Sequence, residues 1–152
     1  KKVDMFYFCS YKYIMKKYLD SKLLLPIHLC KVEAGFPSPA ENYIEQELDL
    51  KEYLIRNSDS TFLVRATGKS MVNVGISPGD ILIVDRSLEA KNNSIIIVSI
   101  DGELTVKRLI KDNNNKKLYL KSENLDYPNI DLKIENDTMV WGVVTYSIHK
   151  TT

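Results

Sequence analysis

The chain has 152 residues, which is enough for one domain with a hydrophobic core but too few for two ordinary domains. Lys and Arg number 21 against 20 for Asp and Glu, so the formal net charge is +1, and the chain lacks the overall positive field with which a protein binds nucleic acid unaided. Cys9 and Cys30 show no CxxC spacing, which disfavours a zinc site or a disulfide framework and favours free thiols. The most apolar early stretch, residues 23–27, is far shorter than the ~20 residues that span a bilayer. We therefore expect a cytoplasmic protein with no membrane segment, metal or cofactor.

Residues 1–34 are predicted to form an arm. Aromatic residues and lysines mix there without a helical or strand period, and Pro26 would end any short helix over residues 16–25. Either Met5 or Met15 is a candidate for the first residue of the natural protein. Residues 1–14 are therefore candidates for a non-native segment or for part of an over-extended reading frame. An arm that contacts nucleic acid through its aromatic side chains is the less favoured alternative.

The next segment, residues 34–40, has the sequence Ala-Gly-Phe-Pro-Ser-Pro-Ala. Each proline biases the residue before it towards extended geometry, so the segment is expected to be an exposed, strand-like connection. A protease cleft accepts such a backbone by strand addition, and the small pair Ala34-Gly35 lets a carbonyl group approach a nucleophile. A plain domain linker is the commoner meaning of this motif taken alone.

A short helix is predicted after Asp49, because Asp49 and Glu52 have the spacing of a capping box. A turn at residues 57–60 then leads into a β-rich run over residues 61–67, which delivers the chain to a Gly-Lys-Ser-Met turn. Residues 71–74 are expected to form a turn or a short helical piece. Residues 75–80 are dense in turn formers, and residues 81–85 are expected to form a short apolar strand. Asp80 and Asp85, which flank this strand, most simply cap turns.

The clearest hairpin signal is Asp101-Gly102, which separates the β-rich runs 94–100 and 103–110. Many short strands separated by turns indicate a mainly β fold that is antiparallel and partly closed. The further predicted elements are a turn over 112–115, a strand over 117–121, a loop over 124–129 and a long last strand over 139–149.

Ser70, in the Gly-Lys-Ser-Met turn, and Lys107, on the second arm of the hairpin, are the candidate catalytic pair. A serine hydroxyl needs a neighbouring base, and a lysine amine is a base only when its site keeps it neutral, since its ordinary pKa is about 10.4. Arg108 is excluded because a guanidinium does not lose its proton in a protein. Alternation puts Lys107 on the face of Thr105 and Leu109 without saying whether that face is buried. The ordinary alternatives are a loop serine and a solvated lysine.

No histidine-based triad competes with this pair. His28 lies in the arm and His149 near the end of the last strand, and neither has a serine and an acid in a suitable context.

Four motifs in order resemble the UmuD/LexA family of self-cleaving Ser–Lys proteins. The resemblance covers the chain from about residue 32 to the end. The four motifs are residues 34–40, the run 68–71, the segment 75–80 with Ile83-Val84-Asp85, and the run 101–109. The Gly-Phe-Pro-Ser-Pro-Ala start resembles UmuD more than LexA. The resemblance implies the β-fold of the LexA/UmuD C-terminal, signal-peptidase-like type with a flexible N-terminal arm.

By that resemblance, Ser70 matches the nucleophile, Lys107 the general base and Ala34-Gly35 the bond that is cut. UmuD members often carry a cysteine at the position of Ala34. An alanine at this position is similar to the cleavage site of the LexA type. The family analogy assigns the oxyanion hole to the backbone N–H groups of Lys69 and Ser70. Cleavage would divide the chain into an arm, residues 1–34, and a domain, residues 35–152.

The resemblance also implies a role in the SOS response to DNA damage. RecA filaments on single-stranded DNA would stimulate cleavage, and the processed homodimer would join a UmuC-like Y-family polymerase in error-prone translesion synthesis, without sequence-specific DNA binding of its own. Two alternatives stay open: a LexA-like repressor lacking its DNA-binding head, and a non-catalytic interaction domain of the same fold. A membrane signal peptidase shares the chemistry but would need an anchor.

Overall fold

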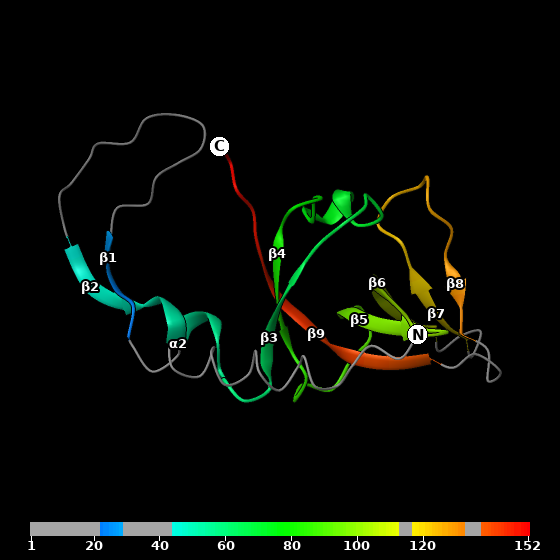
Figure 1. Cartoon of the computed structure of the whole chain (residues 1–152), viewed down its shortest axis with the longest axis horizontal. Helices are drawn as coiled ribbons and strands as arrows, with labels where there is room; N and C mark the ends of the chain where they lie inside the picture. Colours follow the sequence, from blue (N-terminus) through cyan, green and yellow to red (C-terminus); the bar gives the residue numbers. More distant parts are fainter. Residues whose placement is uncertain (1–21, 29–43, 113–116, 133–137) are drawn as a thin grey trace. The chain divides into compact units, whose positions relative to one another are not determined.

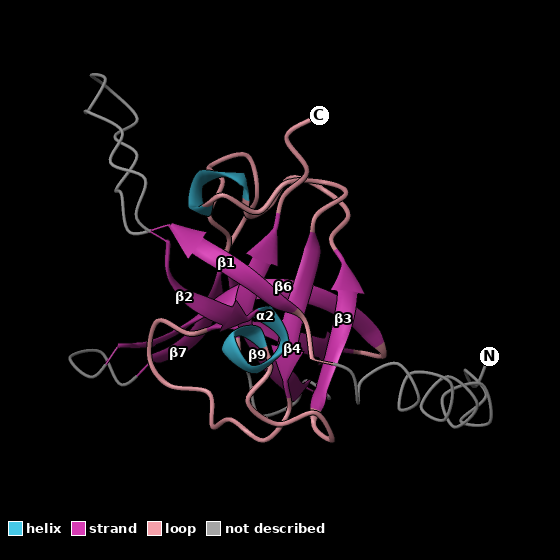
Figure 2. Ribbon diagram, turned by 90° about the vertical axis from the view of Figure 1, so that its left-hand side faces the viewer, coloured by secondary structure: helices cyan, strands magenta, loops and turns pink. Residues whose placement is uncertain are grey.

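The computed structural model describes residues 22–28, 44–112, 117–132 and 138–152 (Figure 1). The chain divides into two compact units, residues 1–56 and residues 57–152. Strands account for most of the regular structure, and helix in the described ranges is limited to α2 and the 3-10 turn η1 (Figure 2). The mainly β, antiparallel fold expected from the sequence is confirmed. None of the helices in those ranges is long and apolar enough to cross a membrane.

The first unit contains a two-stranded antiparallel sheet. Strand β1 (Leu24–His28) pairs with β2 (Ile44–Asp49), with Leu24 opposite Asp49 and Pro26 opposite Glu47. The sequence predicts a weakly ordered arm in which Pro26 would end any short helix over residues 16–25. The structure instead has Leu24–His28 in a strand, and residues 16–21 lie outside the described residues. Proline is tolerated because each strand of a two-stranded sheet has an unpaired edge, where a missing N–H group costs little.

Helix α2 (Leu50–Leu54) follows β2 directly. The Asp49 carboxylate accepts hydrogen bonds from the backbone N–H groups of Lys51 (3.0 Å) and Glu52 (3.3 Å). Asp49 thereby satisfies two of the amide groups that lack a partner at a helix start, as the capping pattern predicts.

The second unit is a seven-stranded antiparallel sheet with the order β3-β4-β9-β5-β6-β7-β8. The last strand of the chain, drawn in red in Figure 1, lies between β4 and β5 and so joins the two halves of the sheet. The strands are β3 (Thr61–Arg65), β4 (Ile81–Asp85), β5 (Ile95–Ile100), β6 (Glu103–Asp112), β7 (Lys117–Lys121), β8 (Ile130–Asp131) and β9 (Thr138–Ile148), with η1 (Val72–Val74) after β3.

Two hydrophobic clusters form the core of this unit, and β5 contributes to both. Ile97 belongs to the first cluster, whereas Ile96 and Val98 belong to the second, as the alternation of side chains along a strand requires. The other buried members are Ala66, Met71, Ile76, Leu82 and Val84 in the first cluster and Leu109 and Leu120 in the second.

The β5–β6 hairpin fixes the position of Lys107. Asp101 and Gly102 have φ angles of 50° and 86°, the positive values that a two-residue turn between twisted strands requires. Ile100 therefore pairs with Glu103, and Lys107 lies opposite Ile96, whose side chain is fully buried. The predicted hairpin is confirmed, and it places Lys107 beside the core.

Candidate active site

Ser70 lies in a turn that is held to the core on both sides. The Ala66 N–H group donates to the Asp80 carbonyl (2.8 Å), and the Gly79 N–H group donates to the Ala66 carbonyl (2.9 Å). Gly68 has a φ angle of 81°, a conformation that glycine adopts without the steric cost of a side chain. On the other side of Ser70, the Met71 side chain is only 2% exposed. The path of the backbone on either side of the serine is thus fixed.

Asp80 organises the neighbouring turn. Its buried carboxylate accepts the Ser77 N–H group (2.8 Å) and lies 2.7 Å from His149 Nδ1. The backbone hydrogen bond from Ser77, followed by the contact with His149, lowers the pKa of Asp80. Asp85 similarly accepts the Ser87 N–H group (2.7 Å), so the sequence correctly assigned both carboxylates to turns.

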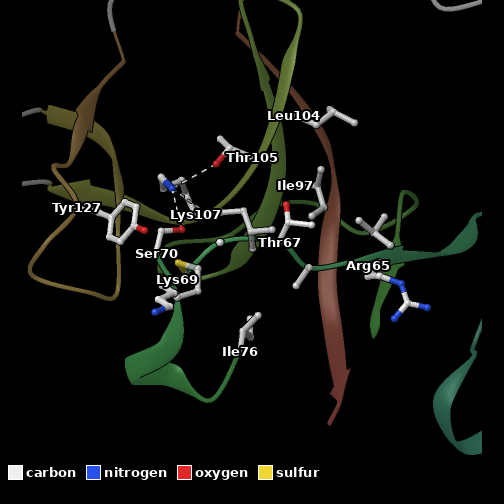
Figure 3. A pocket seen from close by; sticks show the side chains of 15 residues that line it. Arg65, Thr67, Lys69, Ser70, Ile76, Ile97, Leu104, Thr105, Lys107 and Tyr127 are labelled. Carbon is white, nitrogen blue, oxygen red and sulfur yellow. Dashed lines mark hydrogen bonds between the residues drawn. The ribbon is translucent and has the colours of Figure 1, made fainter. Parts of the chain in front are cut away.

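The structure brings Lys107 and Ser70 into direct contact. Lys107 Nζ lies 3.2 Å from Ser70 Oγ, and equally 3.2 Å from Thr105 Oγ1 and from the Val106 carbonyl oxygen (Figure 3). Lys107 is 6% exposed, and it forms no ion pair with a carboxylate in the described ranges. Burial disfavours the charged ammonium and lowers the pKa of Lys107.

These three contacts can be made by an ammonium, which donates to all three oxygens, or by a neutral amine, and it is the burial of Lys107 that favours the neutral form. A neutral lysine has two N–H donors and one lone pair, whereas an ammonium has three donors and no acceptor. The Val106 carbonyl can only accept, and Thr105 Oγ1 can accept the second N–H, which leaves the lone pair for the Ser70 hydroxyl. The arrangement can therefore take a proton from the serine when the amine is neutral.

A groove of about 400 Å³ opens beside the pair. Tyr127 lies on the side of Ser70 and Lys107, and Ile97 and Leu104 lie on the other side (Figure 3). The end of β3 and the serine turn form one part of the groove wall, and strand β6 of the β5–β6 hairpin forms another. The groove thus offers apolar surface next to the two reactive groups.

The serine turn also carries free hydrogen-bond donors. Within the ranges that the structure describes, the backbone N–H groups of Lys69 and Ser70 donate to no other group. Donors of this kind, next to a nucleophile, can stabilise a negative charge that develops on a carbonyl oxygen. No cluster of His, Cys, Asp and Glu suited to a metal ion occurs in the same ranges.

The sequence-predicted residues Lys69, Ser70 and Lys107 all line the groove, whereas Ala34 and Gly35 lie outside the described residues. Thr105 was predicted to share a face with Lys107, but its contact with Nζ was not. The sequence predicts a loop at Asn124 and Tyr127 and indicates no role for either residue at the site. Nothing in the local pattern connects that loop with Ser70, because more than 50 residues separate them.

Comparison with known proteins gives a consistent set of relatives. Residues 26–145 match the peptidase S24-like family. The chain is 42% identical over 125 residues to the protein MucA of Salmonella typhimurium, an alignment that covers 82% of this chain and 84% of MucA. It is 40% identical over 132 residues to the protein ImpA of Shigella flexneri, covering 87% of this chain and 88% of ImpA. It is 36% identical over 120 residues to the LexA repressor of Shewanella pealeana, covering 79% of this chain but 56% of that repressor.

Proposed function

Because the chain belongs to the peptidase S24-like family of self-cleaving serine peptidases, as a UmuD-like member associated with SOS mutagenesis, we propose that it cuts its own backbone between Ala34 and Gly35. Ser70 is the nucleophile and Lys107 the general base. The observation that carries this proposal is the 3.2 Å contact between Lys107 Nζ and Ser70 Oγ, made by a lysine that is buried without a described acidic partner.

The reaction is an acyl transfer. Neutral Lys107 takes the proton of the Ser70 hydroxyl as the oxygen attacks the Ala34 carbonyl carbon, and the oxyanion that forms accepts hydrogen bonds from the backbone N–H groups of Lys69 and Ser70. Protonated Lys107 then gives its proton to the leaving amine of Gly35. Water hydrolyses the acyl-enzyme and restores the free serine.

We further propose that cleavage responds to DNA damage in the cytoplasm. RecA filaments on single-stranded DNA would promote the reaction, and the processed chain, as a homodimer, would serve a UmuC-like Y-family DNA polymerase. The near-neutral charge supports an action on DNA through protein partners, since the chain has no overall basic field. The MucA and ImpA matches extend over most of those proteins, which favours a UmuD-like role over that of a LexA repressor, of which the chain covers about half.

The test is autocleavage of the purified full chain, followed by intact mass. The protein is incubated at neutral pH with and without RecA, single-stranded DNA and nucleotide, and near pH 10 without them. We expect a product that begins at Gly35 and is promoted by the filaments or by alkali, because alkali deprotonates Lys107. Ser70→Ala and Lys107→Ala should stay intact. A wild-type chain that stays intact under all three conditions would refute self-processing.

A further inference from the structure

The side chain of Asn124 joins a distant loop to the serine turn. Asn124 Nδ2 donates a hydrogen bond to the Lys69 carbonyl oxygen (2.9 Å), across 55 positions of sequence. At the other end of the same amide, Asn124 Oδ1 accepts the Asp126 N–H group (3.0 Å). A carbonyl needs a donor and an N–H group needs an acceptor, so the two contacts together determine which end of the amide faces Lys69.

The group that Asn124 holds is the peptide unit between Lys69 and Ser70. In a planar trans peptide, the carbonyl of one residue and the N–H of the next belong to one rigid unit and point in opposite directions. A hydrogen bond that fixes the Lys69 carbonyl therefore also fixes the direction of the Ser70 N–H group, which has no acceptor within the described ranges. The bond also polarises the peptide and makes that N–H a stronger donor.

The loop that carries Asn124 is itself anchored next to the candidate base. The Glu123 carbonyl accepts the Asn73 N–H group (3.0 Å), so the loop holds the serine turn after Ser70 as well as before it. The Glu123 carboxylate pairs with Arg108 Nε (2.6 Å), and Arg108 follows Lys107 on β6. The same loop is thus attached to the serine turn and to the strand that carries Lys107.

We propose that Asn124 is a positioning residue for the oxyanion hole, which it serves by aiming the Ser70 N–H group. This inference rests on the proposed self-cleavage. When Ser70 Oγ bonds to the Ala34 carbonyl carbon, the electron pair of the carbonyl double bond moves to its oxygen and the hydroxyl proton moves to Lys107 Nζ. The Ser70 N–H group stabilises the new oxyanion only if it points at it, and Asn124 sets that direction without touching the substrate.

The experiment measures autocleavage rates of the full chain from pH 7 to pH 10.5 for wild type, Asn124→Ala and Asn124→Asp. Asn124→Asp keeps an oxygen for the Asp126 N–H group but loses the donor to Lys69. The matched control is Asn129→Ala, because Asn129 Oδ1 accepts the Ser122 N–H group in the same loop and Asn129 forms no hydrogen bond to the serine turn within the described ranges. Loss of one oxyanion donor costs about 10²–10³ in rate, so loss of its alignment should slow both Asn124 variants at least about tenfold on the alkaline plateau. Asn129→Ala should stay within about twofold of wild type.

The pH profile separates positioning from mere loop stability. If Asn124 aligns a donor, Asn124→Ala lowers the plateau but leaves the midpoint, which reports Lys107, where it is in wild type. If Asn124 only kept the loop folded, its loss would let water reach Lys107, and the midpoint would rise towards that of an ordinary lysine. The inference is overturned by such a rise, by Asn124 variants that cleave at the wild-type rate, or by an Asn129→Ala variant as slow as Asn124→Ala. A wild-type chain that does not cleave at all refutes the proposed function itself.

Discussion

Lys107 should lower the stability of the folded protein in a way that depends on pH. Its pKa is lowered by burial in the folded state, so the folded chain binds this proton less tightly than the unfolded chain. The destabilisation is therefore complete below the folded pKa, shrinks as the pH rises, and disappears above the pKa of an unfolded lysine. In a Ser70→Ala background, which prevents cleavage, Lys107→Met should raise the midpoint of thermal unfolding at pH 6, and the gain should diminish towards pH 10.

The control is Lys91→Met, which removes the same charge from an exposed position outside the strands. It should change the midpoint little, and by the same amount at pH 6 and pH 10. A Lys107→Met gain that does not vary with pH would contradict a buried, depressed lysine.

The chemistry of single residues indicated the pair of Ser70 and Lys107 but not the environment of that pair. Side-chain chemistry alone supports a serine as the nucleophile and a lysine as the base, and it excludes Arg108 as the base. The burial of Lys107 could not be predicted in this way, because alternation along β6 groups it with Thr105 and Leu109 without saying what covers them; the structure buries both Lys107 and Leu109. The contact between Asn124 and Lys69 was also missed, since it depends on two loops meeting in space.

Among the elements, β9 has a position where a side chain does not fit. A Cβ atom on Gly142 would lie 2.7 Å from Val84 Cγ1 and 3.2 Å from the Asp85 carbonyl oxygen, and Val84 is fully buried. Gly142→Ala should therefore destabilise the protein by about 1–3 kcal/mol, the usual cost of overpacking a core. Chemical denaturation checks this against Met139→Ala on the same strand. Met139 is 56% exposed, so its loss should cost no more than about 0.5 kcal/mol. If Gly142→Ala were as stable as Met139→Ala, β4 and β9 would be able to move apart around the added Cβ atom without a loss of stability, and the prediction would be wrong.

The elements that the sequence predicted well are those with a strong local signal. Strands β4 and β7 have the predicted bounds, and the turn at Asp101-Gly102 is where the dipeptide placed it. Strand β1 was missed because its sequence, Leu-Leu-Pro-Ile-His, has no alternation and contains a proline. Its strand conformation comes from pairing with β2, about 20 residues further along the chain.

At the scale of the molecule, local patterns indicated an antiparallel β fold but not the order of its strands. Strand β9 lies between β4 and β5, and both of these strands are far from β9 in the sequence. A turn signal connects only neighbouring strands, so it cannot predict such a pairing. The same holds for the division of the chain. The structure separates residues 1–56 from residues 57–152, whereas the boundary inferred from the family resemblance, between residues 34 and 35, marks a reaction and stays a prediction.

Residues 57–152 should fold without the rest of the chain. Every buried member of the two hydrophobic clusters lies in this unit, as does the whole seven-stranded sheet. We expect a fragment of these residues carrying Ser70→Ala to unfold in one cooperative transition, with a midpoint close to that of full-length Ser70→Ala. Trp141, the one tryptophan of the chain, packs against Phe62 with ring centroids 4.8 Å apart, so its fluorescence follows this unit in both proteins. Because 1 kcal/mol shifts the midpoint of a domain of about 100 residues by roughly 4–8 °C, a larger drop in the fragment would mean that residues 1–56 supply more than about 1 kcal/mol of its stability.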